Sequence, residues 1–517
     1  MFRQCLLFGS SLALAVALVQ QASAQQSCES LTSLKLQNAT VSSATVVAEG
    51  PFQGPRPGGP PATPLIVPEH CEVKGVATPT SDSEIKFEVW LPTKNWNGNF
   101  EQVGNGGWAG AIPRPSLADS VRRGYAGAGT DDGHTGGGNA EWAIGHPEKL
   151  IDFGYRAVHE TSIQAKTIIR AFYGKENSRA YFVGCSDGGR EALMEAQRYP
   201  NDFNGIVAGA PANYWTHLLA NAVWNAQALT EAPASYIPSS KLAAIQKAVL
   251  AQCDTLDGVK DGLIEDPRRC KFDPELLRCK DADSSECLTE PQIVALKKIY
   301  EGPKNPRTGE QLFPGFSPGA EAAPGGWALW ITGASPAHSF QFMFGNTYFA
   351  DAVFGDVKWD YRTLNFDSDV QRSDSKNASI LDSNNPDLTA FKARGGKLIQ
   401  YHGWGDAAIP PLSSIFYYER VRSFMEGPKA SKAGSASVES FYRLFMVPGM
   451  GHCGGGLGAN NFGNSGVLAQ DPEHDIVAAL DLWVEKGIAP EKIIATGYLG
   501  GSPTRGVALT RPLCPYP

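Results

Sequence analysis

Basic residues are not in excess in this 517-residue chain. Its 45 Lys and Arg stand against 53 Asp and Glu, which gives a formal net charge of −8. Nucleic-acid-binding domains usually carry a clustered excess of Lys and Arg, and no such cluster is visible here. An acidic surface also disfavours binding to anionic membranes. The charge pattern therefore argues against nucleic-acid and membrane partners.

The sequence also lacks an apolar run of comfortable transmembrane length. Leu6–Val19 is apolar almost throughout, but a membrane-spanning helix needs about 20 such residues. Arg3 precedes this run and Ala22-Ser23-Ala24 follows it, which is the pattern of an export signal with a small-residue cleavage site. Residues 1–24 are therefore predicted to be a signal peptide, and the mature protein is expected to be secreted or periplasmic.

Export changes how the cysteines are interpreted. Of ten cysteines, Cys5 leaves with the signal peptide and nine remain. An oxidising compartment favours disulfides over thiolate metal sites. Because nine is an odd number, at least one thiol has no intramolecular partner. Cys514, close to the C-terminal end of the sequence, is expected to be that thiol.

Apolar patterns predict two stretches in which strands and helices alternate. The predicted strands are 85–91, 100–103, 180–183, 205–209, 396–402 and 441–447, and the predicted helices are 151–173, 190–199 and 475–486. This alternation implies a mostly parallel sheet with helices on both faces. Residues 25–65 are expected to form a surface loop with little core of their own.

The segment 212–390 does not continue this alternation of strands and helices. It contains irregular apolar runs, many Pro and Gly residues and four cysteines. It is interpreted as an inserted lid domain. The core is then divided into a first part, 25–211, and a second part, 391–517.

A Gly-x-Ser-x-Gly motif lies between the strand predicted at 180–183 and the next helix. Residues 184–188 read GCSDG. In α/β-hydrolases this turn holds the nucleophilic serine in a strained conformation at the N-terminus of a helix. An ordinary glycine-rich turn would look similar in isolation, but the flanking strand and helix favour a nucleophile at Ser186 and an α/β-hydrolase core.

A serine nucleophile needs a histidine base and a carboxylate that orients the histidine. In α/β-hydrolases these follow in the order Ser, Asp or Glu, His. The chain has nine His residues, and His452 follows a late strand in a glycine-rich loop. Asp406 follows the strand at 396–402, although it could also be a simple turn residue. His402 is interpreted as a buried core histidine.

Cysteines flank both proposed catalytic residues, since Cys185 precedes Ser186 and Cys453 follows His452. If the serine and histidine lie within hydrogen-bonding distance, these cysteines are close enough to form a disulfide. Two buried free thiols are the alternative. The oxyanion hole is expected to use the backbone N–H of Asp187 and that of Gly106 or Gly107.

The lid contains an acidic loop, CDTLDGVKDG, at residues 253–262. Carboxylates on a glycine-containing turn suit Ca²⁺, although a solvated acidic turn would also explain them. Cys253 and Cys270 bracket the loop and could cross-link it. A structural Ca²⁺ is predicted here.

The GCSDGGR motif at 184–190, the Gly-His-Cys step at 451–453 and the acidic loop together resemble the tannase and feruloyl esterase family. This family also includes mono(2-hydroxyethyl) terephthalate hydrolases. The resemblance implies a Ser–His–Asp esterase with a calcium-binding lid. It assigns the calcium ligands to the side chains of Asp254, Asp257 and Asp261 and the carbonyls of Val259 and Leu263. The implied disulfides are Cys185–Cys453, Cys28–Cys71, Cys253–Cys270 and Cys279–Cys287.

The resemblance implies an ester of an aromatic acid as substrate, with feruloyl esters favoured over galloyl esters and terephthalate monoesters. No lid arginine stands out as a clamp for a terephthalate carboxylate. Lid aromatics could stack on the acyl group, although most are expected to be lid core; they are Phe344, Tyr348, Phe349, Phe354 and Trp359. A serine peptidase and a non-catalytic, calcium-stabilised binding protein are the rival functions.

Overall fold

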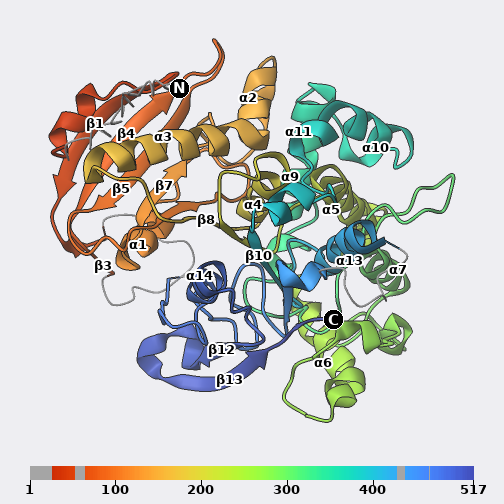
Figure 1. Cartoon of the computed structure of the whole chain (residues 1–517). Coiled ribbons are helices and arrows are strands. Elements are labelled where there is room, and N and C mark those ends of the chain that lie inside the picture. Colours follow the sequence, from red (N-terminus) through yellow and green to blue (C-terminus); the bar gives the residue numbers. More distant parts are fainter. Residues whose placement is uncertain (1–25, 53–64, 428–436, 465) are drawn as a thin grey trace, which may run out of the picture.

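The computed structural model describes residues 26–52, 65–427, 437–464 and 466–517. Its central element is a ten-stranded β-sheet (Figure 1). The predicted signal peptide lies outside the described residues. The strand order is β1-β4-β5-β7-β6-β8-β9-β10-β11-β14. The six strands from β7 to β11 in this order run parallel, whereas β1, β4, β5 and β14 pair antiparallel with their neighbours.

The six strands that the apolar pattern predicted are present, and four others in the sheet, β1, β4, β7 and β14, were missed. The sheet consists of β1 (Ala39–Val47), β4 (His70–Ala77), β5 (Ile85–Pro92), β6 (Phe100–Val103), β7 (Ala126–Thr130), β8 (Ala180–Cys185), β9 (Gly205–Gly209), β10 (Lys397–Gly403), β11 (Tyr442–Val447) and β14 (Pro515–Tyr516). The missed β7 reads AGAGT and is fully buried. Small residues are required there, because a Cβ on Gly127 would lie 3.0 Å from the Cβ of Ser120.

The expectation of a surface loop at 25–65 is wrong for its described part. Strand β1 pairs with β4 from Ala39 opposite Ala77 to Val47 opposite His70. It was missed because most of its side chains are exposed at the sheet edge. Its Ser and Thr residues interrupt the alternation of apolar and polar residues that would predict a strand. A Cys28–Cys71 disulfide with a Cα–Cα distance of 5.7 Å fastens this N-terminal segment to β4.

Helices cover both faces of the sheet. One hydrophobic cluster contains Phe182 of β8 together with residues of α3 (Ala157–Tyr173), α4 (Asp187–Arg198) and α13 (Leu412–Glu426). A second hydrophobic cluster contains Tyr181 of β8 together with residues of α14 (Ile476–Lys486). Neighbouring residues of a strand point to opposite faces. The two clusters are therefore on opposite sides of the sheet, and the predicted α/β-hydrolase core is confirmed.

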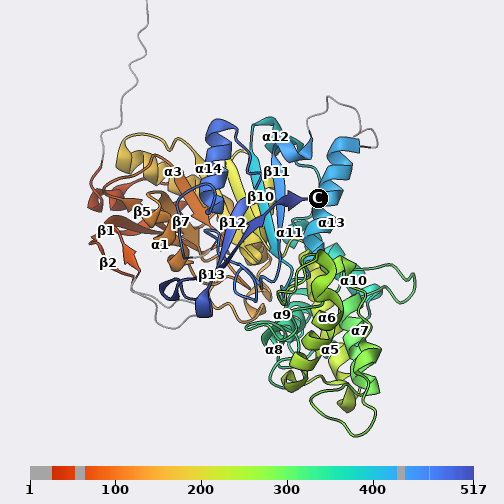
Figure 2. The same cartoon turned by 90° about the horizontal axis from the view of Figure 1, so that it is seen from below.

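The segment 212–390, which is described throughout, adds helices but no strand to the main sheet. Its principal helices are α5 (Trp215–Thr230), α6 (Leu242–Cys253), α7 (Glu290–Glu301), α8 (Trp327–Trp330), α9 (Phe340–Thr347) and α10 (Ser368–Ser373). Figure 2 shows them gathered to one side of the core. The Cys253–Cys270 and Cys279–Cys287 disulfides that the resemblance implied are both present in this segment.

A C-terminal hairpin, β12 (Ile493–Tyr498) and β13 (Val507–Leu513), forms a small separate sheet that the sequence analysis did not predict. Cys514 follows it and is the free cysteine among the described residues, in agreement with expectation. Within the part of the chain that the structure describes, no helix is long and apolar enough to cross a membrane.

A buried ion pair joins the two parts of the core. Asp475 caps the N-terminus of α14 by accepting hydrogen bonds from the backbone N–H groups of Val477 and Ala478. The same carboxylate binds Arg123 with an N–O distance of 2.7 Å, and the two side chains are 0% and 7% exposed.

The Asp475→Ala variant is expected to lose about 3–5 kcal/mol of unfolding free energy, because removing one partner of a buried ion pair leaves the other charge buried without a partner. Urea denaturation of the variant against the wild type measures this loss. Asp471→Ala removes an exposed carboxylate from the same segment and serves as the control. A loss below about 1 kcal/mol, the value of an ordinary surface pair, would contradict the assignment.

Candidate active site

Ser186 occupies the turn between β8 and α4 in a conformation that non-glycine residues rarely adopt, with φ of 66° and ψ of −120°. The flanking glycines make this turn possible. A Cβ on Gly184 would lie 2.3 Å from the carbonyl oxygen of Gly188, and one on Gly188 would lie 2.8 Å from that of Asn105. Larger residues cannot fit, and the strained serine presents its hydroxyl above the end of the sheet.

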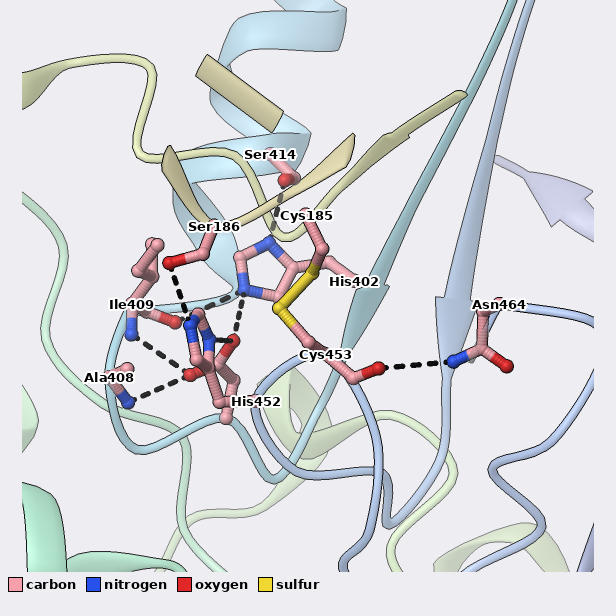
Figure 3. Close-up of a disulfide and its surroundings, with 10 residues drawn as sticks. Cys185, Ser186, His402, Ala408, Ile409, Ser414, His452, Cys453 and Asn464 are labelled. Carbon is pink, nitrogen blue, oxygen red and sulfur yellow. Dashed lines mark hydrogen bonds and ion pairs between the residues drawn. A yellow bond between two sulfur atoms is a disulfide. The ribbon is translucent and has the colours of Figure 1, made fainter. Parts of the chain in front are cut away.

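The His452 ring faces Ser186 (Figure 3), and on its other side it contacts Asp406. Its Nε2 is 2.9 Å from the Ser186 Oγ, and its Nδ1 is 2.8 Å from the Asp406 Oδ2. These contacts place the Nδ1 proton toward the carboxylate and leave Nε2 free to accept the serine proton. The structure thus brings together the three residues that the sequence analysis selected from distant parts of the chain.

The loops that carry Asp406 and His452 pack directly against each other. The N–H of Gly405 donates to the carbonyl of Met450 at 2.8 Å. A Cβ on Gly403 would lie only 2.3 Å from the same Met450 oxygen. The glycines around both residues therefore allow two backbones to approach closely, and this approach sets the distance between the carboxylate and the imidazole.

Asp406 is buried and fully engaged. Its Oδ1 accepts the backbone N–H groups of Ala408 and Ile409 at 2.8 and 2.9 Å, while its Oδ2 accepts from His452 and from His402 at 3.1 Å. Burial by itself would raise the pKa of Asp406, but the neighbouring His452 and His402 overcome this effect and hold the pKa well below its usual value. The carboxylate is therefore ionised across the physiological range.

His402 contributes more to this arrangement than the sequence analysis anticipated. It is completely buried, as a core histidine would be. Its Nδ1 also lies 2.7 Å from the Ser414 Oγ, and its Nε2 faces both Asp406 and the carbonyl of Ile409. The position of His402 at the end of β10 was the available signal, but only the loop conformation shows that it binds Asp406.

A disulfide joins Cys185 to Cys453, with a Cα–Cα distance of 5.9 Å. It connects the residue before Ser186 to the residue after His452, as expected. Cys453 has a positive φ of 60°, and its carbonyl accepts a hydrogen bond from the Asn464 side chain at 3.1 Å. The covalent link limits how far the histidine loop can move from the serine.

The N–H groups proposed for the oxyanion hole border the same space. Asp187 is the first residue of α4, so its N–H has no acceptor within the helix. Gly106 and Gly107 lie in the loop after β6 and line the cavity beside Ser186. This loop is anchored next to the nucleophile, because the carbonyl of Asn105 accepts the N–H of Gly188 at 2.9 Å.

A cavity of about 1010 Å³ opens at Ser186 and His452 between the core and the lid. On the lid side it is lined by Leu218, Leu219 and Ala222 of α5 and by Trp330, Met343 and Phe344. The Trp330 ring meets the His452 ring edge to face, with centroids 5.2 Å apart. Phe344 packs over Gly107, where an added Cβ would lie 3.2 Å from the ring.

Of the five lid aromatics selected from the sequence, Phe344 alone lines this cavity. Tyr348 and Phe349 are completely buried, and Phe354 and Trp359 pack on Phe349. These four are lid core, as expected for most of the set. Trp330 was missed, because spacing along an irregular lid sequence does not indicate which ring faces the serine.

The cavity offers little free positive charge. Arg123 is the basic residue among its described lining residues. Its guanidinium is already held by Asp475 and by the carbonyl of Gly463 at 2.7 Å. A negatively charged acyl group would find no uncommitted cation here.

The predicted calcium loop follows α6 and is closed by the Cys253–Cys270 disulfide. Its three carboxylates and two carbonyls are the hard oxygen donors that Ca²⁺ prefers. Asp254 accepts the N–H groups of Asp261 and Gly262, and Asp261 binds Arg511 at 3.1 Å. Among the described residues, the oxygen atoms of these three carboxylates do not all lie within 4.8 Å of one another. The donor chemistry fits Ca²⁺, and the site stays a prediction.

The predicted calcium loop contacts the loop that carries His452. The buried Leu263 packs against Gly449 in the histidine loop, where an added Cβ would lie 2.5 Å from the leucine Cδ2. Order in the acidic loop can therefore influence the position of His452.

Known proteins are similar to this chain in both fold and sequence. The profile of the tannase and feruloyl esterase family matches residues 71–517. An uncharacterized esterase of Xanthomonas campestris is 46% identical over 519 residues, covering 97% of this chain and 89% of the relative. A probable feruloyl esterase B-2 of Aspergillus terreus is 34% identical, covering 86% and 82%. The crystal structure of feruloyl esterase B from Aspergillus oryzae superposes with a TM-score of 0.84 at 30% identity, covering 95% of each chain. The chain belongs to the tannase and feruloyl esterase family of carboxylic ester hydrolases.

Proposed function

We propose that this chain is an exported serine esterase that cleaves esters of aromatic carboxylic acids, of the feruloyl type, through an acyl-enzyme on Ser186. The observation that carries the proposal is the hydrogen-bonded series Ser186–His452–Asp406, which opens into a cavity with aromatic walls on the lid side. The probable feruloyl esterase of Aspergillus terreus supports the choice of acyl group.

In the proposed mechanism the Ser186 oxygen attacks the ester carbonyl while His452 Nε2 takes the hydroxyl proton. The N–H of Asp187 and that of Gly106 or Gly107 stabilise the oxyanion of the tetrahedral intermediate. The C–O bond to the alcohol then breaks, and His452 returns the proton to the departing alcohol. Water attacks the acyl-enzyme by the same sequence of steps and releases the acid.

Asp406 supports this proton transfer in two ways. It holds the imidazole in the tautomer with Nε2 unprotonated, and it stabilises the imidazolium that forms when the serine proton arrives. Because the pKa of Asp406 lies well below its usual value, the carboxylate keeps this role in mildly acidic solution.

The Ser186→Ala variant is expected to lose labelling by a fluorophosphonate probe and to lose more than 10³-fold in kcat/KM on p-nitrophenyl esters. Asp406→Asn should lower kcat by about 10⁴-fold, because an amide favours the wrong histidine tautomer. The conservative substitution of a serine outside the site, Ser284→Ala, is the control. A labelled Ser186→Ala variant would refute the proposed nucleophile, and an unlabelled, inactive wild type would favour the binding-protein alternative.

The cavity favours a neutral aromatic acyl group. Its lid wall is apolar apart from Gln341, and Arg123 is committed to Asp475 and Gly463. An ion pair between Arg123 and a terephthalate carboxylate would first have to break these contacts. Galloyl esters carry additional hydroxyl groups, and burying an unpaired hydroxyl is unfavourable.

Initial rates on a substrate panel test this preference. Methyl ferulate should be cleaved with a kcat/KM at least tenfold above that for mono(2-hydroxyethyl) terephthalate and above that for methyl gallate. The matched amide, feruloyl methylamide, should be cleaved far more slowly than the ester. Preference for the gallate or the terephthalate monoester would redirect the assignment within the family, and faster amide cleavage would favour a peptidase.

Export and a structural calcium ion complete the proposal. Four disulfides support an oxidising compartment for the mature chain. The side chains of Asp254, Asp257 and Asp261 and the carbonyls of Val259 and Leu263 would hold the ion. Bound there, it would neutralise the clustered carboxylates and order the loop that supports Gly449.

Removal of Ca²⁺ with EGTA is expected to lower Tm, since a ligand at 100 times its Kd stabilises the folded state by about 2.7 kcal/mol. Asp257→Asn should have a low Tm that EGTA no longer changes. Asp281→Asn alters an exposed carboxylate elsewhere in the lid and should respond to EGTA like the wild type. Equal Tm values with and without EGTA in the wild type would rule out a stabilising calcium site.

A further inference from the structure

Three buried carboxyl groups lie directly beneath the nucleophile turn, and the proposed mechanism uses none of these side chains. Asp132, Asp187 and Glu191 each have an oxygen within 4.8 Å of the others. All three residues are at most 2% exposed. Such a concentration of acidic groups under a reaction that develops negative charge calls for a physical explanation.

One cation accompanies these carboxyls. Arg190 is completely buried, and its Nε donates to the Asp187 Oδ1 at 2.5 Å. Its other N–H groups donate to the carbonyls of Gly154 and Phe153 at 2.7 and 2.9 Å. A single guanidinium cannot neutralise three buried carboxylates, so the group retains protons. Burial raises the pKa of Asp187 to about 7 and, together with the nearby Glu191, raises the pKa of Asp132 well above its usual value.

Asp132 and Glu191 are placed to share one of these protons. Neither oxygen of Asp132, nor Oε1 of Glu191, accepts a hydrogen bond from an N–H or hydroxyl group of the described residues. A proton carried by Asp132 and donated to Glu191 would give a partner to one Asp132 oxygen and to Glu191 Oε1. The second oxygen of Glu191 is then free to accept a different hydrogen bond.

That second oxygen binds the loop of the proposed oxyanion hole. Glu191 Oε2 accepts the backbone N–H of Asn105 at 3.0 Å. Asn105 is otherwise held by its side chain, which donates to the carbonyl of Thr130 at 2.9 Å, and by its carbonyl, which accepts from Gly188. The approach is close, because a Cβ on Gly104 would lie 2.8 Å from the Glu191 Oε2.

We propose that Glu191, held by a proton shared with Asp132, is a positioning residue that fixes Asn105 and thereby aims the N–H groups of Gly106 and Gly107 at the oxyanion. This inference rests on the proposed serine esterase mechanism. Asp187, which supplies the other N–H, and Glu191 stand one turn apart on α4. A single rigid helix thus sets both sides of the oxyanion hole.

The same helix supplies a matched control. Glu195 lies one further turn along α4 and is 1% exposed, compared with 2% for Glu191. Burial and the adjacent Asp202 raise its pKa well above the usual value, as expected for a buried acid. No hydrogen bond joins Glu195 to the oxyanion loop among the described residues.

The test compares Glu191→Met, Glu191→Gln and Glu195→Met by steady-state kinetics on methyl ferulate and by thermal unfolding. Glu191→Met removes the acceptor for Asn105, and a small displacement of reacting groups can cost about 100-fold in rate. We expect kcat to fall 10–100-fold with KM within threefold of the wild type. Glu191→Gln keeps an acceptor oxygen for Asn105 and should retain at least a third of kcat. Glu195→Met should lower Tm similarly but leave kcat within twofold.

Two results would overturn the inference in an active enzyme. One is a Glu191→Met variant that is destabilised but as fast as Glu195→Met, which would make Glu191 purely structural. The other is a Glu191→Gln variant as slow as Glu191→Met, which would mean that the acceptor for Asn105 is not what matters.

If Glu191→Met does not fold, Asp132→Ala removes the shared proton from the other side. It should lower kcat at least threefold with KM little changed, and an unchanged kcat would overturn the inference. A wild type with no esterase activity and no fluorophosphonate labelling at Ser186 would instead overturn the proposed function on which the inference rests.

Discussion

The pair of hydrogen bonds on the His452 imidazole is the interaction on which the rest of the structure depends. One bond, of 2.8 Å, comes from a loop after β10, and the other, of 2.9 Å, reaches a serine at the end of β8. The net contribution of such a hydrogen bond to stability is modest, because water competes for the same groups. Both bonds persist because the loops are fixed independently, by the Cys185–Cys453 disulfide and by the close backbone contact between Gly403 and Met450.

Glycine and buried charge act together around this centre. Glycines at 184, 188 and 403 let three backbones approach more closely than side chains would allow. Asp406 is stabilised as an anion by two histidines and two backbone N–H groups, whereas burial raises the pKa of Asp132 and of Asp187 beneath Ser186, where Arg190 is the nearby cation. Opposite pKa shifts in neighbouring buried acids thus arise from the number of donors that each one meets.

The lid forms one wall of the cavity at Ser186, and few of its aromatic side chains line that wall. Trp330 and Phe344 face His452 and Gly107, and both rings also pack against the larger hydrophobic cluster around Phe349, which joins the lid to the core. The acidic loop between Cys253 and Cys270 is linked to the active site through Leu263 and Gly449.

Sequence patterns predicted six strands of the sheet (β5, β6, β8, β9, β10 and β11), the nucleophile turn and the identities of Ser186, Asp406 and His452. Their signals are local, since a buried parallel strand and a glycine-rich turn each have a characteristic pattern along the chain. Tertiary structure alone decided the edge strand β1, the small-residue strand β7, the second histidine on Asp406 and the bond from Glu191 to Asn105. These features depend on contacts between segments far apart in sequence, or on polar side chains whose partners no periodicity reveals.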